Sequence, residues 1–271
     1  MVLKRLSVVL MCWSIVSCDD FGHRNVGNGD SEVIDSPVHV SLWEILNPDG
    51  RDLRLNCVTE KIYGCVNFSI SYQSEIQSNL ITLFLTGIFK PQICLTALGP
   101  AAASIPLGSF ANGEYPLQFV VNAQVSTFQL QVTDETYILS GPPTLWIQLE
   151  RDTLGRIPLD AIWGYVGYGR YGEDGGPSPG AQIVIDSLYQ AGAQPLALSD
   201  GDYGYFEVYS GRIKPWENHG NLLVVTFMMI YSGVEEDLEL IVDWSGNKYG
   251  EFMDVALYTD KGSSYYSWIQ P

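Results

Sequence analysis

A serine, two aspartates and a histidine occur in the chain in the order that some serine hydrolases use. The segment 176–180, Gly-Pro-Ser-Pro-Gly, matches the Gly-x-Ser-x-Gly pattern of a nucleophile elbow. Asp200, Asp202 and His219 follow as candidate acids and base. The elbow needs a strand that runs directly into the serine, whereas a glycine-rich loop precedes Ser178, whose hydroxyl can instead cap the helix that follows. We therefore expect no catalysis and keep a serine hydrolase as a distant alternative.

Three of the five cysteines could form a disulfide or hold a metal in a processed, exported chain. Cys12 and Cys18 lie in or at the end of the N-terminal apolar segment, which leaves Cys57, Cys65 and Cys94. In an oxidising compartment this number predicts one disulfide and one spare thiol. We expect Cys65 to pair with Cys94, because each lies beside a strand-like run, and Cys57 to stay unpaired. No zinc site or other cofactor is expected, because the chain has no Cys-x-x-Cys motif and its histidines are far apart.

The first 18 residues predict export and lipid attachment. Residues 1–17 carry two basic residues and then a short apolar run, the order of a secretory signal. The run is shorter than the ~20 residues that a transmembrane helix needs. The tetrapeptide that ends in Cys18, Ile-Val-Ser-Cys, resembles the lipobox of bacterial lipoproteins, which implies that Cys18 carries the lipid. Residues 18–36 are polar and read as a flexible, acidic tether.

The charge balance argues against several partners. Acidic residues outnumber basic ones 31 to 14, and the net charge is −17. Phosphate backbones and anionic lipid headgroups repel such a protein, so we expect neither nucleic-acid binding nor docking on a membrane through a basic patch. The acidic groups at 200–202 and 235–237 lack the alternating oxygen ligands of a calcium loop and read as solvated surface charge.

The pattern of residues 37–140 predicts an immunoglobulin-like β-sandwich of about 100 residues. Short runs rich in β-branched and aromatic residues alternate with turn residues, and no helical period competes with them. The best strand candidates are residues 65–72, 80–87, 115–122 and 125–132.

After Gly141-Pro142-Pro143 the pattern changes, and residues 143–271 predict a ferredoxin-like α+β domain. A helix is expected at 179–191, where apolar residues recur with a helical period. A second is expected at 234–249, which a capping box of Ser232 and Glu235 opens and Gly250 closes. The expected strands are residues 162–168, 203–209, 222–231 and 252–258, with a further hairpin strand at 264–268. The predicted fold class is therefore a multidomain α+β protein, with the sandwich followed by a βαββαβ domain and its added C-terminal strand.

Aromatic residues gather on one predicted face of this second sheet. Trp163 and Tyr165 share a face of one strand, and Tyr203 and Tyr205 share a face of the next. If the aliphatic face packs on the helices, the aromatic face is either an open platform for a glycan or a protein, or it is covered by the first domain or by a second subunit. The sequence leaves both alternatives open.

Four stretches carry a resemblance to a known group. They are Tyr63-Gly64-Cys65, the run from Pro91 to Ala101, and the segments 202–206 and 257–262. They resemble stretches of predicted lipoproteins of Bacteroidota, and the likeness covers most of the mature chain. It implies an envelope location and agrees with the pairing of Cys65 and Cys94, while Cys57 lies outside the shared pattern. That group has no assigned activity, so the resemblance brings no catalytic residue.

We therefore expect a lipid-anchored protein of the bacterial cell envelope, at the outer membrane, with the side of the membrane left open. It is expected to act as a binding or structural interaction module, with an envelope protein as its partner. Glycan binding on the aromatic face is the main alternative.

Overall fold

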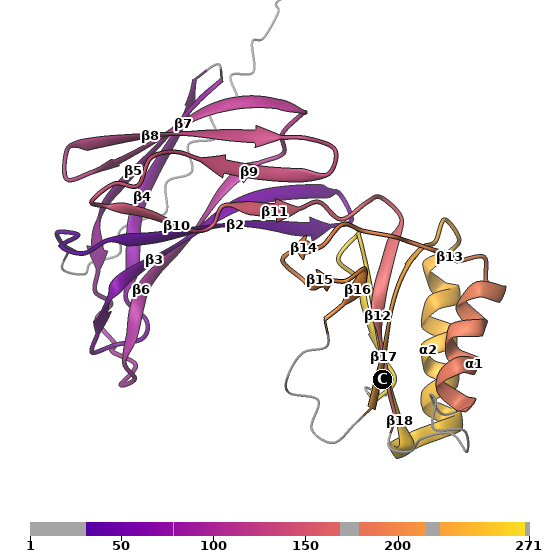
Figure 1. The fold of residues 1–271 in the computed structure, drawn as a ribbon. Helices are drawn as coiled ribbons and strands as arrows, with labels where there is room; N and C mark the ends of the chain where they lie inside the picture. Colours follow the sequence, from indigo (N-terminus) through magenta and orange to yellow (C-terminus); the bar gives the residue numbers. More distant parts are fainter. Residues whose placement is uncertain (1–30, 78, 169–178, 215–222, 269–271) are drawn as a thin grey trace, which may run out of the picture.

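The structure is a computed structural model that describes residues 31–77, 79–168, 179–214 and 223–268 (Figure 1). The predicted signal segment, Cys18 and nearly all of the tether lie outside these residues, and so do Ser178 and His219. No helix among the residues described is long and apolar enough to cross a bilayer.

Residues 31–155 form one large sheet with eleven strands. The strand order is β10-β2-β3-β6-β4-β5-β7-β8-β9-β11, and the short β1 pairs with β5. The strands are β1 (Ser31–Glu32), β2 (Val38–Asn47), β3 (Gly50–Tyr63), β4 (Ser69–Gln77), β5 (Leu80–Phe89), β6 (Gly99–Gly108), β7 (Gly113–Val121), β8 (Gln124–Val132), β9 (Thr136–Ser140), β10 (Ile147–Arg151) and β11 (Thr153–Gly155).

The sheet curls until its two ends nearly meet (Figure 1). Its two end strands, β10 and β11, are consecutive in the chain, and only Asp152 separates them. Inside the curl, alternate residues of each strand form one apolar core, as Val38, Val40 and Leu42 do in β2. Glu44 occupies the next inward position of β2 and is also buried.

The predicted immunoglobulin-like sandwich is therefore wrong. A sandwich has two antiparallel sheets, whereas these strands form one nearly closed, barrel-like sheet in which β10–β2, β4–β6 and β5–β7 are parallel neighbours. The alternating pattern identified many of the strands, but it specifies only which face of each strand is buried. It does not specify which strands pair, so one curled sheet and two stacked sheets have the same signature. The sheet also continues past Pro143, because β10 pairs with β2 and β11 with β9.

The C-terminal part contains a five-stranded sheet with the order β13-β17-β12-β18-β19. Its elements are β12 (Ala161–Tyr168), α1 (Pro179–Gln190), β13 (Gln194–Pro195), β17 (Leu223–Ile230), α2 (Glu235–Tyr249), the 3₁₀ turn η1 (Gly250–Phe252), β18 (Met253–Thr259) and β19 (Ser264–Tyr266). The helices α1 and α2 lie side by side on one face of the sheet and form a second core with it (Figure 1). Both helices are found within one residue of their predicted bounds.

The ferredoxin-like prediction is nevertheless wrong, and with it the predicted fold class, because the chain is mainly β. Residues 203–209 do not form a strand of the five-stranded sheet. They belong to a separate small sheet of β14 (Gly201–Asp202), β15 (Glu207–Tyr209) and β16 (Arg212–Ile213). The chain turns back within the predicted strand: Gly204 has φ +81°, and the Tyr203 N–H donates to the Phe206 carbonyl. On the side of β17 away from β12, the only strand among the described residues is the two-residue β13.

The predicted disulfide between Cys65 and Cys94 is confirmed, with the two Cα atoms 5.3 Å apart. It links the end of β3 to the loop before β6. Cys57 is a free, buried thiol in the core of the large sheet.

Candidate binding groove beside strand β17

The aromatic residues singled out in the sequence lie together, but most of their surface is covered. Trp163 and Tyr203 are buried, whereas Tyr165 and Tyr205 are half-buried. Trp163 is in ring contact with Phe206 at 5.3 Å, Tyr205 at 5.9 Å and Tyr258 at 6.0 Å between centroids. The small sheet and the turn between β14 and β15 therefore cover the face of the five-stranded sheet opposite the helices.

Two acidic side chains hold the small sheet in its conformation. Asp200 accepts hydrogen bonds from the Gly211 and Ser210 backbone N–H groups, which lower the pKa of its carboxyl group. Asp202 accepts from the Gly204 N–H and forms an ion pair with Arg151 of β10 at 2.6 Å. Asp200 and Asp202, the candidate acids of the serine-hydrolase alternative, therefore both have structural partners in the fold.

The large sheet supports the covering turn from the other side. Trp43 of β2 is in ring contact with Tyr205 at 5.5 Å, and the Leu46 N–H donates a hydrogen bond of 3.2 Å to the Tyr205 hydroxyl. Leu46, Trp163 and Phe206 belong to one buried apolar cluster that both sheets share. Tyr205 is therefore fixed between the two sheets.

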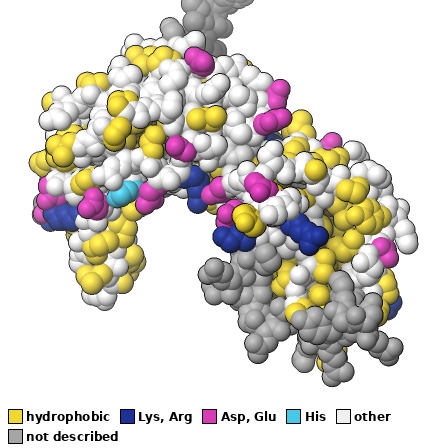
Figure 2. All heavy atoms as spheres, in the orientation of Figure 1, with side chains coloured by type: hydrophobic (Ala, Val, Ile, Leu, Met, Phe, Trp, Pro, Cys, Tyr) yellow, Lys and Arg dark blue, Asp and Glu magenta, His cyan; other side chains and the backbone are white. Residues whose placement is uncertain are grey.

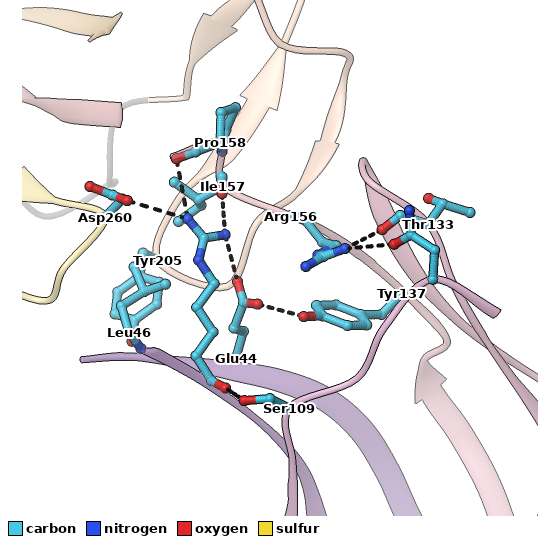
Figure 3. A network of polar contacts seen from close by, with 12 residues as sticks. Glu44, Leu46, Ser109, Thr133, Tyr137, Arg156, Ile157, Pro158, Tyr205 and Asp260 are labelled. Carbon is cyan, nitrogen blue, oxygen red and sulfur yellow. Dashed lines mark hydrogen bonds and ion pairs between the residues drawn. The ribbon is translucent and has the colours of Figure 1, made fainter. Parts of the chain in front are cut away.

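A buried polar network stands beside this contact (Figure 3). Arg51 of β3 lies 3.5 Å from a carboxylate oxygen of Glu44 and 3.5 Å from one of Asp260, and it donates to the Ile157 and Pro158 carbonyls. Arg51 thus connects the large sheet to the segment before β12 and to the end of β18.

Burial governs the acidity of the two carboxyl groups in this network. Glu44 and Asp260 are only 3% and 7% exposed, and burial raises the pKa of each, while Arg51 opposes that rise. The Tyr137 hydroxyl donates to Glu44 at 2.6 Å, and the Arg156 guanidinium lies 4.9 Å from the Tyr137 ring centroid. Every charged side chain of the network contacts protein partners, so its role is structural. We call Arg51, Glu44 and Asp260, with Tyr137 and Arg156, the buried latch.

A narrow cavity remains between the small sheet and the five-stranded sheet. It has about 30 Å³ of free volume, little more than one or two water molecules need. Its walls are mainly aromatic and aliphatic, and they include Trp163, Tyr165, Tyr205, Phe206, Ile213, Val224, Thr226 and Tyr258. Three of the four predicted platform residues therefore line this cavity, while Tyr203 stands behind its wall.

A much larger groove adjoins the cavity along β17. Its volume is about 710 Å³, and it shares Ile213, Lys214, Val224 and Thr226 with the cavity. Helix α1 supplies one wall with Gln182, Ile185 and Tyr189, and the small sheet supplies the other with Tyr209, Arg212 and Ile213. The residues from Val224 to Met229 form its floor.

The floor is a strand edge, part of which no described strand pairs with. On this side β17 pairs with β13 only at Ile230 and Met229, and the Leu196 N–H donates to the Met228 carbonyl. Because alternate residues of a strand direct their N–H and C=O groups to the same side, those of Val224 and Thr226 point to this side too. Within the described ranges no strand pairs with them. As far as the described residues go, the outer edge of β17 between Val224 and Thr226 is thus open.

Sequence reasoning did not identify this groove. The almost wholly apolar run of β17 is typical of a strand with neighbours on both edges. In the structure β17 is apolar because both of its faces are covered, by helices on one side and by the small sheet on the other. The sequence did carry one signal: the prolines and glycines around the expected strand at 203–209 favour turns over a long strand that could pair with β17.

Comparison with known proteins adds no functional information: no family model, no curated protein and no solved structure matches this chain. Among the residues described, no group of three or more His, Cys, Asp or Glu side chains could hold a metal ion.

Proposed function

We propose that this chain is a lipid-anchored protein of the bacterial cell envelope that acts by binding rather than by catalysis. Its anchor is the predicted lipid on Cys18, supported by the sequence of residues 1–18. Its ligand is an extended polypeptide segment that adds to the open edge of β17. The observation that supports this ligand most directly is the open edge of β17, which lies in a groove of about 710 Å³.

The groove suits an added strand on both of its sides. A peptide paired with β17 would satisfy the N–H and C=O groups of Val224 and Thr226 and so contribute main-chain hydrogen bonds. Its side chains would alternate between two environments, one beside Ile185 and Tyr189 of α1 and the other at the mouth of the aromatic cavity. The expected ligand therefore has apolar side chains at alternate positions, and a small one facing the cavity.

The rim of the groove adds a preference by charge. Its charged side chains are Arg212 and Lys214, and Lys214 pairs with Glu207 at 3.0 Å. Because Lys214 is already paired, Arg212 is the side chain that gives the rim its basic character, and it favours a ligand with an acidic side chain near one end. The glycan alternative lacks its open platform, because Trp163 and Tyr203 are buried.

Amide hydrogen exchange followed by NMR tests the open edge directly. In the free protein the Val224 and Thr226 N–H groups should exchange fast, while those of Val225 and Phe227, which face β12, should be protected. Peptides selected from a displayed library of unstructured 12-residue sequences should protect Val224 and Thr226 when they bind. Slow exchange at both positions in the free protein would contradict the proposed site.

A proline substitution tests the same edge by mutation. Thr226→Pro removes one outward N–H group, together with the 3.3 Å hydrogen bond from the Thr226 hydroxyl to the Ile213 carbonyl, and it keeps the N–H groups that face β12, as prolines at strand edges do. The variant should stay folded but lose most of its affinity for the selected peptides. Equal affinity of the variant would mean that the peptides bind elsewhere. The anchor is tested separately, because Cys18→Ala should release the protein from the membrane fraction or stall its processing.

A further inference from the structure

The loop before β6 exposes a group of large apolar side chains. Ile93 is 77% exposed and Leu98 is 78% exposed, and Leu95, Val66 and Ile62 are each exposed by about half or more. The segment from Pro91 to Leu98 carries no charged residue. In Figure 2 the lower ends of β3 and β6 form a protrusion whose visible side chains are hydrophobic or uncharged. We call residues 91–98, together with Ile62 and Val66, the apolar tip.

Covalent and polar contacts hold the apolar tip in this exposed form. The Cys65–Cys94 disulfide crosses its centre. The Asn67 side chain donates to the Ile93 carbonyl at 2.7 Å and accepts from the Leu95 N–H at 3.1 Å. Ile93 and Leu95 therefore cannot turn inward without loss of these bonds. A fixed cluster of exposed apolar side chains of this kind marks an interaction site on a soluble surface.

The position of the tip points to the partner. Strand β1 pairs with Ile88 and Phe89, which directly precede the tip, and Lys90 forms an ion pair with Glu32 of β1. The described fold thus begins beside the tip. Only 12 residues separate Cys18 from Ser31. Since a chain spans at most ~3.6 Å per residue, a lipid on Cys18 lies within about 45 Å of β1.

We propose that the apolar tip is a second membrane contact, which inserts Ile93, Leu95 and Leu98 into the interface of the bilayer that holds the lipid of Cys18. The inference rests on the lipid anchor of the proposed function. Insertion is apolar rather than electrostatic: Lys61 and Lys90 at the base of the tip are already paired with Asp35 and Glu32. The proposed contact therefore needs no anionic lipid, and a neutral bilayer is sufficient. Two contacts fix the orientation of the body, whereas one lipid tether does not.

Vesicle binding of a lipid-free chain tests this contact. Residues 1–18 are replaced by a cleavable secretory signal without a lipobox, so that residues 19–271 are exported and the disulfide can form. The purified protein is sedimented with phosphatidylcholine vesicles. It should bind, and Ile93→Ser/Leu98→Ser should lower the partition coefficient by about tenfold or more, because two apolar side chains no longer leave water.

The control is Leu145→Ser/Leu159→Ser, which changes two leucines exposed to a similar degree away from the tip. It should bind vesicles like the parent. Equal binding by both double variants, or no vesicle binding by the parent, overturns the proposal. Binding of the tip to a purified envelope protein without vesicle binding overturns it too. The mass of the Cys18 peptide from the native membrane fraction reports the lipid anchor separately, so a failed anchor and a failed tip give different results.

Discussion

Removal of Arg51 should destabilise the protein strongly. Arg51 is 15% exposed and lies 3.5 Å from each of two buried carboxylates. Arg51→Met keeps much of the side-chain volume but removes the ion-pair partner of Glu44 and Asp260, and it removes two hydrogen bonds to backbone carbonyls. Breaking a buried ion pair in this way typically costs about 3–5 kcal/mol. For a chain of this size the expected fall in Tm is about 10 °C.

The loss should depend on pH in a specified direction. Burial raises the pKa of Glu44 and Asp260 in the folded state, and removing Arg51 raises it further. Above pH ~4, where these groups ionise in the unfolded chain, the folded protein then binds more protons than the unfolded chain. Its stability therefore falls as pH rises through the folded-state pKa. The difference in unfolding free energy between wild type and Arg51→Met should be smallest near pH 4 and largest at pH 7.

Urea denaturation at pH 4, 5.5 and 7 measures this difference. Arg54→Met is the matched control, because Arg54 lies on the same strand and pairs with Asp52 at 2.9 Å, but both side chains are partly exposed. Its loss should be about 0–1 kcal/mol at each pH. Equal losses for the two variants, or a loss at Arg51 that does not change with pH, would refute the assignment of Arg51 as the cation of a buried latch.

Three further experiments test the packing and the state of the cysteines. Trp163→Ala should lower the unfolding free energy by about 3–5 kcal/mol in urea denaturation, whereas Trp244→Ala, at a 38% exposed position, should cost far less. Gly164→Ala would place its Cβ 2.0 Å from the Ala256 carbonyl oxygen and should prevent normal folding, while Gly64→Ala, with no atom within 4 Å, should fold normally by circular dichroism. Burial raises the pKa of Cys57 to about 12, so iodoacetamide should modify it only after unfolding, and mass spectrometry of non-reduced peptides should show the Cys65–Cys94 link.

Local features of this protein were predictable from its sequence where local physics decides them. The helical period of α1, the Gly250 that ends α2 and the cysteine count each depend on neighbouring residues or on composition. The sandwich prediction failed because strand pairing is non-local: β2 pairs with β10, more than 100 residues away in the chain. No feature of residues 38–47 alone identifies that partner.

The candidate site was predictable only in part. Trp163, Tyr165 and Tyr205 do lie around one cavity, but the sequence placed Tyr203 and Tyr205 on a strand of the same sheet. Gly204, with φ of +81°, allows the chain to turn there and to cover the face instead. One signal for the latch was present: Glu44 stands at an inward position of an otherwise apolar alternation in β2. A charge at such a position predicts a buried partner.

The closure of the large sheet by β10 and β11 has a consequence for the folding of a chain that emerges N-terminus first. The outer edge of β2 stays unpaired until Ile147–Arg151 has emerged, because β10 is the only strand of the described chain that pairs with it on that side. During synthesis the chain therefore presents an exposed strand edge for as long as it takes to add about 100 more residues. The large sheet therefore cannot be completed until β10 and β11 are present. A chain truncated before residue 147 should aggregate through the edge of β2.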